Sequence, residues 1–162
     1  MKSSVLLHNI RSVYNVGSIF RTADAAGFDH VYLCGYTPLP IDRFGRARSD
    51  MNKVALGAEQ SLSWSQLENP REDIQKLKES GAHIVAVEQD GRSIPYHEFN
   101  ISKDTEIKEL VIVMGEEVAG IEKDILDAAD TIIEIPMRGE KESLNVSVAF
   151  GVVAYELKKA KE

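Results

Sequence analysis

Short runs of β-branched and other apolar residues alternate along this chain with stretches of helical periodicity, and this alternation constrains the fold more than any other feature. The strand-like runs are residues 5–7, 31–34, 84–87, 110–114 and 131–135. The helical patterns cover residues 17–26, 52–60 (the weakest), 71–80, 122–129 and 144–159. Alternating strands and helices are typical of a mostly parallel sheet with helices on both faces. We therefore predict an α/β fold.

The length of 162 residues fits one domain with a core large enough to need neither a disulfide nor a metal. Cys34 is the only cysteine, and the four histidines lack metal-ligand spacing, so we predict no metal site. The N-terminus does not resemble a signal peptide, and no apolar run approaches the roughly 20 residues that cross a bilayer. We expect a single domain over residues 1–162, cytoplasmic and without a membrane partner.

The last predicted helix is apolar around most of its circumference. Two stripes run along it, one made of Leu144, Val148, Val152 and Tyr155 and the other of Val146, Ala149, Val153 and Leu157. A helix of this kind is covered on more than one side. One side can pack on its own sheet, and we expect the other to pack on a second copy of the chain in a homodimer.

The net charge of −7 argues at first sight against a nucleic-acid partner, but the charge is unevenly distributed. Residues 106–142 hold eleven acidic and four basic residues, so this stretch carries the whole net charge. Elsewhere Arg43, Arg46, Arg48 and Lys53 lie close together, opposed only by two aspartates. This loop is either a local basic patch or an ordinary solvated loop, and charge alone does not decide between them.

Polar residues stand at the start of the last predicted helix. Residues 135–139 read Ile-Pro-Met-Arg-Gly, and residues 143–147 read Ser-Leu-Asn-Val-Ser. A strand that stops at a proline, a short loop and a polar first helical turn offer free backbone N–H groups beside polar side chains. The segment indicates a ligand pocket more readily than a structural turn.

Two further motifs carry candidate functional groups. Asn15 and Gly17 stand just before a predicted helix, and Arg21 lies one turn inside it, so that the amide and the guanidinium can converge on one side. Residues 115–120 read Gly-Glu-Glu-Val-Ala-Gly and place a glycine and paired carboxylates at the end of a predicted strand.

Together, and in this order, the three motifs resemble those of the SpoU (TrmH-type) branch of the SPOUT methyltransferases, which methylate the ribose 2′-hydroxyl in tRNA or rRNA. The resemblance spans essentially the whole chain. It implies an α/β domain with a C-terminal trefoil knot, S-adenosyl-L-methionine as the methyl donor bound at the knot, and an active site completed across a homodimer. Composition and periodicity alone do not predict a knot, because knots are nearly absent from proteins.

The resemblance also implies roles for individual residues. Its catalytic positions correspond to Asn15, Arg21, Glu117, Ser143 and Asn145. Its donor contacts, largely from the backbone, correspond to Val87, Gly115, Ile135, Met137, Ser143 and Leu144. The sequence departs from the pattern at Glu116, where relatives commonly carry asparagine, and this added negative charge puts the substrate preference in doubt.

Each of these residues also has a purely structural interpretation. Asn15 and Ser143 are good helix caps, and Glu117 near a helix start can complement the helix dipole. Arg21 can form a surface ion pair of little energetic value, and Met137 can fill the core. The three motifs in order favour the functional interpretation for Asn15, Arg21, Glu117 and Asn145.

Methyl transfer to a hydroxyl requires a more nucleophilic oxygen held in line with the methyl group. We expect Arg21 to stabilise the developing oxyanion or the adjacent phosphate, because a guanidinium with a pKa above roughly 12 is a poor general base. The base role, which proposals for the family assign to the corresponding arginine, stays open.

The predicted partner is RNA rather than DNA, because the reaction needs the 2′-hydroxyl. Residues 36–53, with Arg43, Arg46 and Arg48, are the candidate RNA-contacting loop. Two rival interpretations are a non-catalytic RNA-binding module and an unknotted small-molecule methyltransferase. The latter would carry a glycine-rich loop after its first strand, where this sequence has only Gly17.

Overall fold

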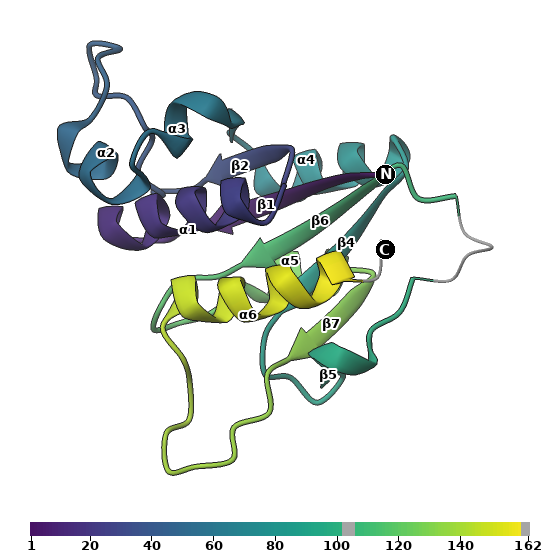
Figure 1. Cartoon of the computed structure of the whole chain (residues 1–162). Helices are drawn as coiled ribbons and strands as arrows, with labels where there is room; N and C mark the ends of the chain where they lie inside the picture. The colour runs from purple at the N-terminus through teal and green to yellow at the C-terminus, as the bar shows by residue number, and fades with distance from the viewer. Residues whose placement is uncertain (102–105, 160–162) are drawn as a thin grey trace.

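The computed structural model describes residues 1–101 and 106–159, which form a parallel β-sheet with helices on both faces (Figure 1). The seven strands are β1 Lys2–His8, β2 His30–Cys34, β3 Ser63–Leu67, β4 Ala82–Val87, β5 Ile94–Pro95, β6 Glu109–Met114 and β7 Thr131–Glu134. Their order across the sheet is β3-β2-β1-β6-β4-β7-β5, and every neighbouring pair is parallel. The predicted α/β class and mostly parallel sheet are confirmed.

Two layers of helices cover the sheet. The helices are α1 Val13–Ala25, α2 Ser49–Ala55, α3 Ala58–Ser61, α4 Pro70–Glu79, α5 Lys123–Ala128 and α6 Val146–Lys159, with a short 3-10 helix, η1 Tyr96–Glu98. One core cluster joins α1, α2 and α6 to the sheet, and a second joins α4 and α5 to the opposite face. In Figure 1, α1 and α6 lie in front of the central strands.

The strands read as continuous apolar runs because both faces of the sheet are buried. Along β1, Val5 and Leu7 belong to the core under α1 and α6, whereas Leu6 belongs to the core under α4 and α5. Phe150 of α6 is fully buried and meets Phe28 edge to face, with 5.4 Å between ring centroids. Such packing anchors α6 on the sheet.

The element boundaries differ from the predictions in ways that have local causes. Helix α1 begins four residues earlier than predicted, because the Ser12 hydroxyl caps it by accepting the Asn15 N–H at 3.2 Å. The predicted helix at residues 52–60 is divided into α2 and α3, because Leu56 and Gly57 have positive φ angles of 53° and 92°.

Strands β3 and β5 were not predicted. Strand β3 is a partly exposed edge strand rich in polar residues, and β5 has only two residues, so neither carries the apolar signal of a buried strand. Among the described residues, no helix is long and apolar enough to cross a membrane.

The topology brings four connections to one edge of the sheet. In a parallel sheet the carboxyl ends of all strands lie at the same edge, where ligands bind in open α/β folds. The segments that follow β1, β4, β6 and β7 therefore meet at this edge, although they come from opposite ends of the chain. They include all three sequence motifs.

Candidate active site

Three side chains from the three motifs form one hydrogen-bonded cluster. The Asn15 amide nitrogen, on α1, donates to Oε1 of Glu117 at 3.0 Å. The Asn145 amide nitrogen donates to Oδ1 of Asn15 at 3.1 Å. Residues 130 positions apart in the sequence thus meet directly.

Glu117 also fixes the loop that leads into α1. Its carboxylate accepts the backbone N–H groups of Arg11 at 3.1 Å and Ser12 at 3.3 Å. Burial raises the pKa of Glu117, but the hydrogen bonds from Asn15, Arg11 and Ser12 outweigh burial, so that the pKa lies below its ordinary value. The cluster therefore contains an ionised acceptor at neutral pH.

Asn145 connects the cluster to the start of α6. Its Oδ1 accepts the Ser147 N–H at 2.9 Å and the Ser147 hydroxyl at 2.6 Å, which is the geometry of a helix cap. Because the oxygen serves the cap, the amide nitrogen is left to point at Asn15. The Asn145 side chain therefore caps α6 with its oxygen and makes the candidate catalytic contact with its nitrogen.

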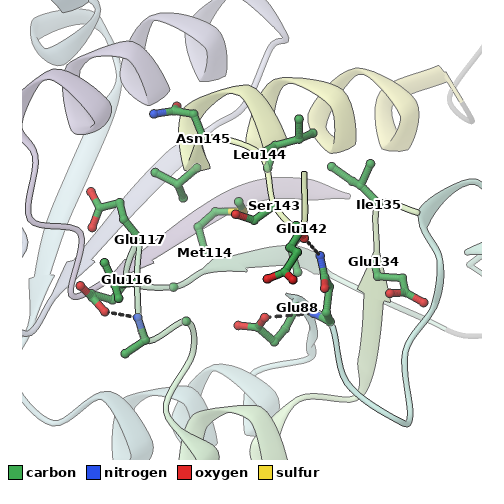
Figure 2. A pocket seen from close by; sticks show the side chains of 18 of the residues that line it. Glu88, Met114, Glu116, Glu117, Glu134, Ile135, Glu142, Ser143, Leu144 and Asn145 are labelled. Atoms are coloured by element: carbon green, nitrogen blue, oxygen red, sulfur yellow. Dashed lines mark hydrogen bonds between the residues drawn. The ribbon is translucent and has the colours of Figure 1, made fainter. Parts of the chain in front are cut away.

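A cavity of about 390 Å³ lies beside this cluster (Figure 2). All six residues predicted to surround the methyl donor line it: Val87, Gly115, Ile135, Met137, Ser143 and Leu144. Glu117 and Asn145 also line it. In Figure 2 these two lie on one side of the cavity and Glu134 and Ile135 on the other. The volume is within the roughly 300–1,000 Å³ of small-molecule sites.

The turn at residues 115–120 forms one wall of the cavity and depends on Gly115. A Cβ atom at this position would lie 2.5 Å from the Ile121 nitrogen and 2.6 Å from the Gly120 carbonyl carbon. The turn closes through two backbone hydrogen bonds between Glu116 and Gly120, of 3.1 and 2.9 Å. Only glycine at position 115 permits this close approach.

Five carboxylates line the cavity, and three of them were not identified from the sequence. Besides Glu116 and Glu117, they are Glu88, Glu134 and Glu142. Glu88 accepts the Ile121 N–H at 2.9 Å and comes directly after β4. The sequence signal that could have identified Glu88 as a site residue is its position directly after a buried strand. Apolar walls from Met114, Ile135 and Leu144 complete a site suited to a cation with an apolar body.

Arg21 lies outside the cluster and the cavity. Because α1 begins at Val13, Asn15 and Arg21 both lie in this helix. The six positions that separate them correspond to one and two-thirds helical turns. The two side chains therefore point about 120° apart rather than converging as predicted. Arg21 is exposed, and within residues 1–101 and 106–159 its side chain forms no ion pair or hydrogen bond, so the interpretation as a surface ion pair does not apply to it.

The predicted RNA-contacting arginines lie in the connection between β2 and α2. Asp42 shapes this loop by accepting the N–H groups of Phe44 at 2.8 Å and Arg46 at 3.0 Å. Phe44 is 66% exposed, with the guanidinium carbons of Arg43 and Arg46 at 4.7 and 5.0 Å from its ring centroid. Two of these arginines pair with aspartates: Arg46 Nε donates to Oδ2 of Asp42 at 2.9 Å, and Arg48 forms a two-bond pair with Asp50.

The remaining nucleophile and metal candidates have structural surroundings. Cys34 is buried, and this burial is the main cause that raises its pKa to about 12, as expected for an inert thiol. Burial also lowers the pKa of His8, which lies at the end of β1. No group of three His, Cys, Asp or Glu side chains suited to a metal ion occurs in the part of the chain that is described.

The fold and the site define a class of protein: an α/β protein with a small-molecule cavity at the carboxyl edge of a parallel sheet and a polar cluster at its rim. The family model of the SpoU rRNA methylases matches residues 2–155. The chain belongs to this family.

Two curated relatives and one solved structure illustrate the relationship. A tRNA (guanosine(18)-2′-O)-methyltransferase of Aquifex aeolicus is 32% identical over 98% of this chain. A 23S rRNA (guanosine-2′-O-)-methyltransferase of Neisseria meningitidis is 31% identical over 96% of it. An AdoMet-bound rRNA methyltransferase from Sinorhizobium meliloti superposes with a TM-score of 0.86 at 26% identity over 98%. The chain spans 69%, 57% and 56% of these three proteins, respectively.

The hydrogen bond from Asn15 makes a testable contribution to the ionisation of Glu117. The substitution Asn15→Ala removes a hydrogen-bond donor that stabilises the ionised form of Glu117, so we expect the pKa of Glu117 to rise. NMR titration of the Glu117 side-chain carboxyl measures this pKa. Because the pKa of Glu117 is lower in the folded protein than in the unfolded chain, its ionisation contributes to the free energy of unfolding. This contribution is fully present at a pH above the unfolded-state pKa and is lost as the pH falls through the folded-state pKa.

Gln75→Ala is the matched control, because the Gln75 amide donates to Glu79 on α4, away from the site. It should leave the Glu117 titration unchanged. An unshifted Glu117 pKa in Asn15→Ala would contradict the assigned hydrogen bond.

Proposed function

We propose that this protein transfers a methyl group from S-adenosyl-L-methionine to the ribose 2′-hydroxyl of a tRNA or rRNA nucleotide, as a single catalytic domain acting in the cytoplasm. The observation that carries the proposal is the cluster of Asn15, Glu117 and Asn145 at the rim of a cavity. The names of the two relatives described above, each an RNA 2′-O-methyltransferase, support the same reaction.

The cavity fits this donor. When bound, the donor supplies a methyl group activated by a positively charged sulfur. The carboxylates around the cavity suit that charge, and Met114, Ile135 and Leu144 suit its apolar parts. In this proposal the donor is held by Val87, Gly115, Ile135, Met137, Ser143 and Leu144. The loop between β7 and α6 carries four of these residues, and the Gln89 side chain fixes it by donating to the Glu142 carbonyl at 2.6 Å.

The cluster would orient the ribose and shield it from water. Asn15 and Asn145 present amide groups, and Glu117 presents a carboxylate, at the side of the cavity where the acceptor would enter. Ser143 is exposed at the same rim. Preorganised groups of this kind lower the barrier by fixing the attack geometry in advance.

We further propose that a homodimer completes the site and that Arg21 acts across it. Leu144, just before α6, and Val148 and Tyr155 of α6 are exposed by 40%, 52% and 52%, along one of the two apolar stripes described above. Arg21, which has no partner among the described residues of its own chain, would then clamp the oxyanion or phosphate at the other cavity.

The C-terminal trefoil knot is part of the proposal. Strand β7 lies between β4 and β5 in the sheet, and α6 packs on α1 and also on η1. The chain that follows β7 would be threaded through an earlier loop, as the family resemblance implies. Such threading would hold residues 135–145 in the shape that the cavity needs.

The reaction is tested by incubating the protein with methyl-labelled donor and RNA, digesting the RNA to nucleosides and identifying 2′-O-methylated products by mass spectrometry. We expect donor-dependent product from the unmodified protein. Arg21→Ala should reduce turnover by about 100-fold or more, with donor affinity unchanged within about twofold.

Arg71→Ala serves as the control, because Arg71 is an exposed arginine of α4 that pairs weakly with Asp124 at 3.6 Å. Bound RNA without any methylated product would favour the RNA-binding module instead. Normal turnover in Arg21→Ala would remove Arg21 from the reaction.

We propose that Phe44 contacts the RNA together with Arg43, Arg46 and Arg48. Replacing Arg43→Glu and Arg46→Glu together should weaken RNA binding and lower the slope of log K against log salt by about 1 to 2. The measurement is a salt series of RNA affinities by fluorescence anisotropy. The double variant Arg71→Glu with Lys76→Glu changes the net charge equally on α4 and should bind like the unmodified protein. Unchanged affinity and slope in the loop variant would place the RNA elsewhere.

The dimer is tested by sedimentation equilibrium over a range of concentrations. We expect a mass of twice the 18.0 kDa chain, and monomers when Val148→Asp and Tyr155→Asp are combined, because both charges would be buried in the interface. Leu56→Asp is a control on another exposed apolar residue, at the end of α2. A monomeric mass at every concentration for the unmodified protein would overturn the proposed dimer.

A further inference from the structure

We propose that Arg11 is a positioning residue for the reaction: its ion pair with Glu116 holds the 115–120 turn against the loop before α1, and so keeps Glu117 in contact with Asn15. This inference rests on the proposed function for its kinetic consequences. The contacts themselves are independent of it.

Glu116 is a buried carboxylate with an incomplete set of hydrogen bonds. Its side chain is 5% exposed. One oxygen accepts the Ala119 N–H within the same turn. The other, Oε1, makes no hydrogen bond within the described residues, and the Arg11 Nε lies 3.1 Å from it. A buried carboxylate without a nearby cation is strongly destabilising, so Arg11 supplies the charge that this site needs.

Arg11 is connected to the turn twice, once through its backbone and once through its side chain. Its N–H donates to Oε2 of Glu117 at 3.1 Å, while its guanidinium pairs with the neighbouring Glu116. The guanidinium also lies over the Tyr36 ring, 5.5 Å from the centroid, which limits the directions it can take. Two adjacent carboxylates therefore hold one residue, and the turn cannot shift without breaking both contacts.

The position of these contacts links them to the candidate chemistry. Arg11 stands four residues before Asn15, and the intervening Ser12 caps α1 and donates its own N–H to Glu117. If the guanidinium were lost, the Glu116 carboxylate would move toward water and draw Glu117 away from Asn15. A displacement of about 1 Å in such a constellation lowers the rate by up to roughly 100-fold.

The other explanation for Arg11 is a direct contact with an RNA phosphate, because its side chain is 72% exposed at the rim of the site. The two explanations differ in their dependence on Glu116. A positioning role disappears when the buried charge is removed, whereas a phosphate contact does not. A double-mutant cycle therefore separates them.

The experiment compares Arg11→Ala, Glu116→Gln, the double variant and Arg11→Lys in the 162-residue chain. Gln at position 116 can still accept the Ala119 N–H but carries no charge. We expect Arg11→Ala to lower kcat by roughly 10- to 100-fold, with KM for RNA changed by less than about threefold. The double variant should recover most of this loss, and Arg11→Lys should retain part of the rate. Arg71→Ala is the control on an exposed ion pair.

A second measurement does not depend on activity. The pKa of Glu117, followed by NMR, should rise in Arg11→Ala and return toward the unmodified value in the double variant. If the unmodified protein methylates no RNA, the proposed function fails, and this titration still decides the positioning role. A higher KM with unchanged kcat and no recovery by Glu116→Gln would overturn the proposal in favour of a phosphate contact. An unchanged kcat, KM and Glu117 titration in Arg11→Ala would overturn it outright.

Discussion

The hydrogen bonds that join Asn145 to Asn15 and Asn15 to Glu117 are the interaction on which the site depends. They connect the first helix, the turn after β6 and the start of the last helix. A parallel sheet makes this meeting feasible, because it brings the ends of β1, β6 and β7 to one edge. Each side chain also has a local structural task, since Asn145 caps α6 and Glu117 accepts N–H groups of the loop before α1. Fold stability and site geometry are thus maintained by the same side chains.

The distribution of charge gives the two proposed ligands separate places. Acidic residues line the cavity, where a cationic donor would bind. The basic groups Arg43 and Arg46 lie on a loop after β2, around the exposed Phe44. The net charge of −7 therefore comes from the part of the chain that includes the cavity wall, and not from the loop proposed to contact RNA. Local potential, rather than total charge, governs where a polyanion approaches.

The sequence predicted the buried strands well, because they leave a strong local pattern. Apolar runs identified five of the seven strands, and the six residues that the resemblance assigns to the donor all line one cavity. Three features had no such pattern. The Ser12 cap moved the start of α1 and with it the direction of Arg21. Asp42 and Asp50 pair with Arg46 and Arg48, and Arg11 compensates the charge of Glu116 from 105 positions away in the sequence. Pairings of this length depend on the fold and cannot be read from neighbouring residues.

The central claim is that segments from both ends of the chain enclose a site for a sulfonium methyl donor. Isothermal titration calorimetry of the protein with S-adenosyl-L-methionine tests it most directly, without any RNA. The account predicts saturable binding of one donor per chain, and loss of the signal when Leu144→Trp fills the cavity in a protein that remains folded. Absence of detectable heat with the unmodified protein at millimolar donor would contradict it.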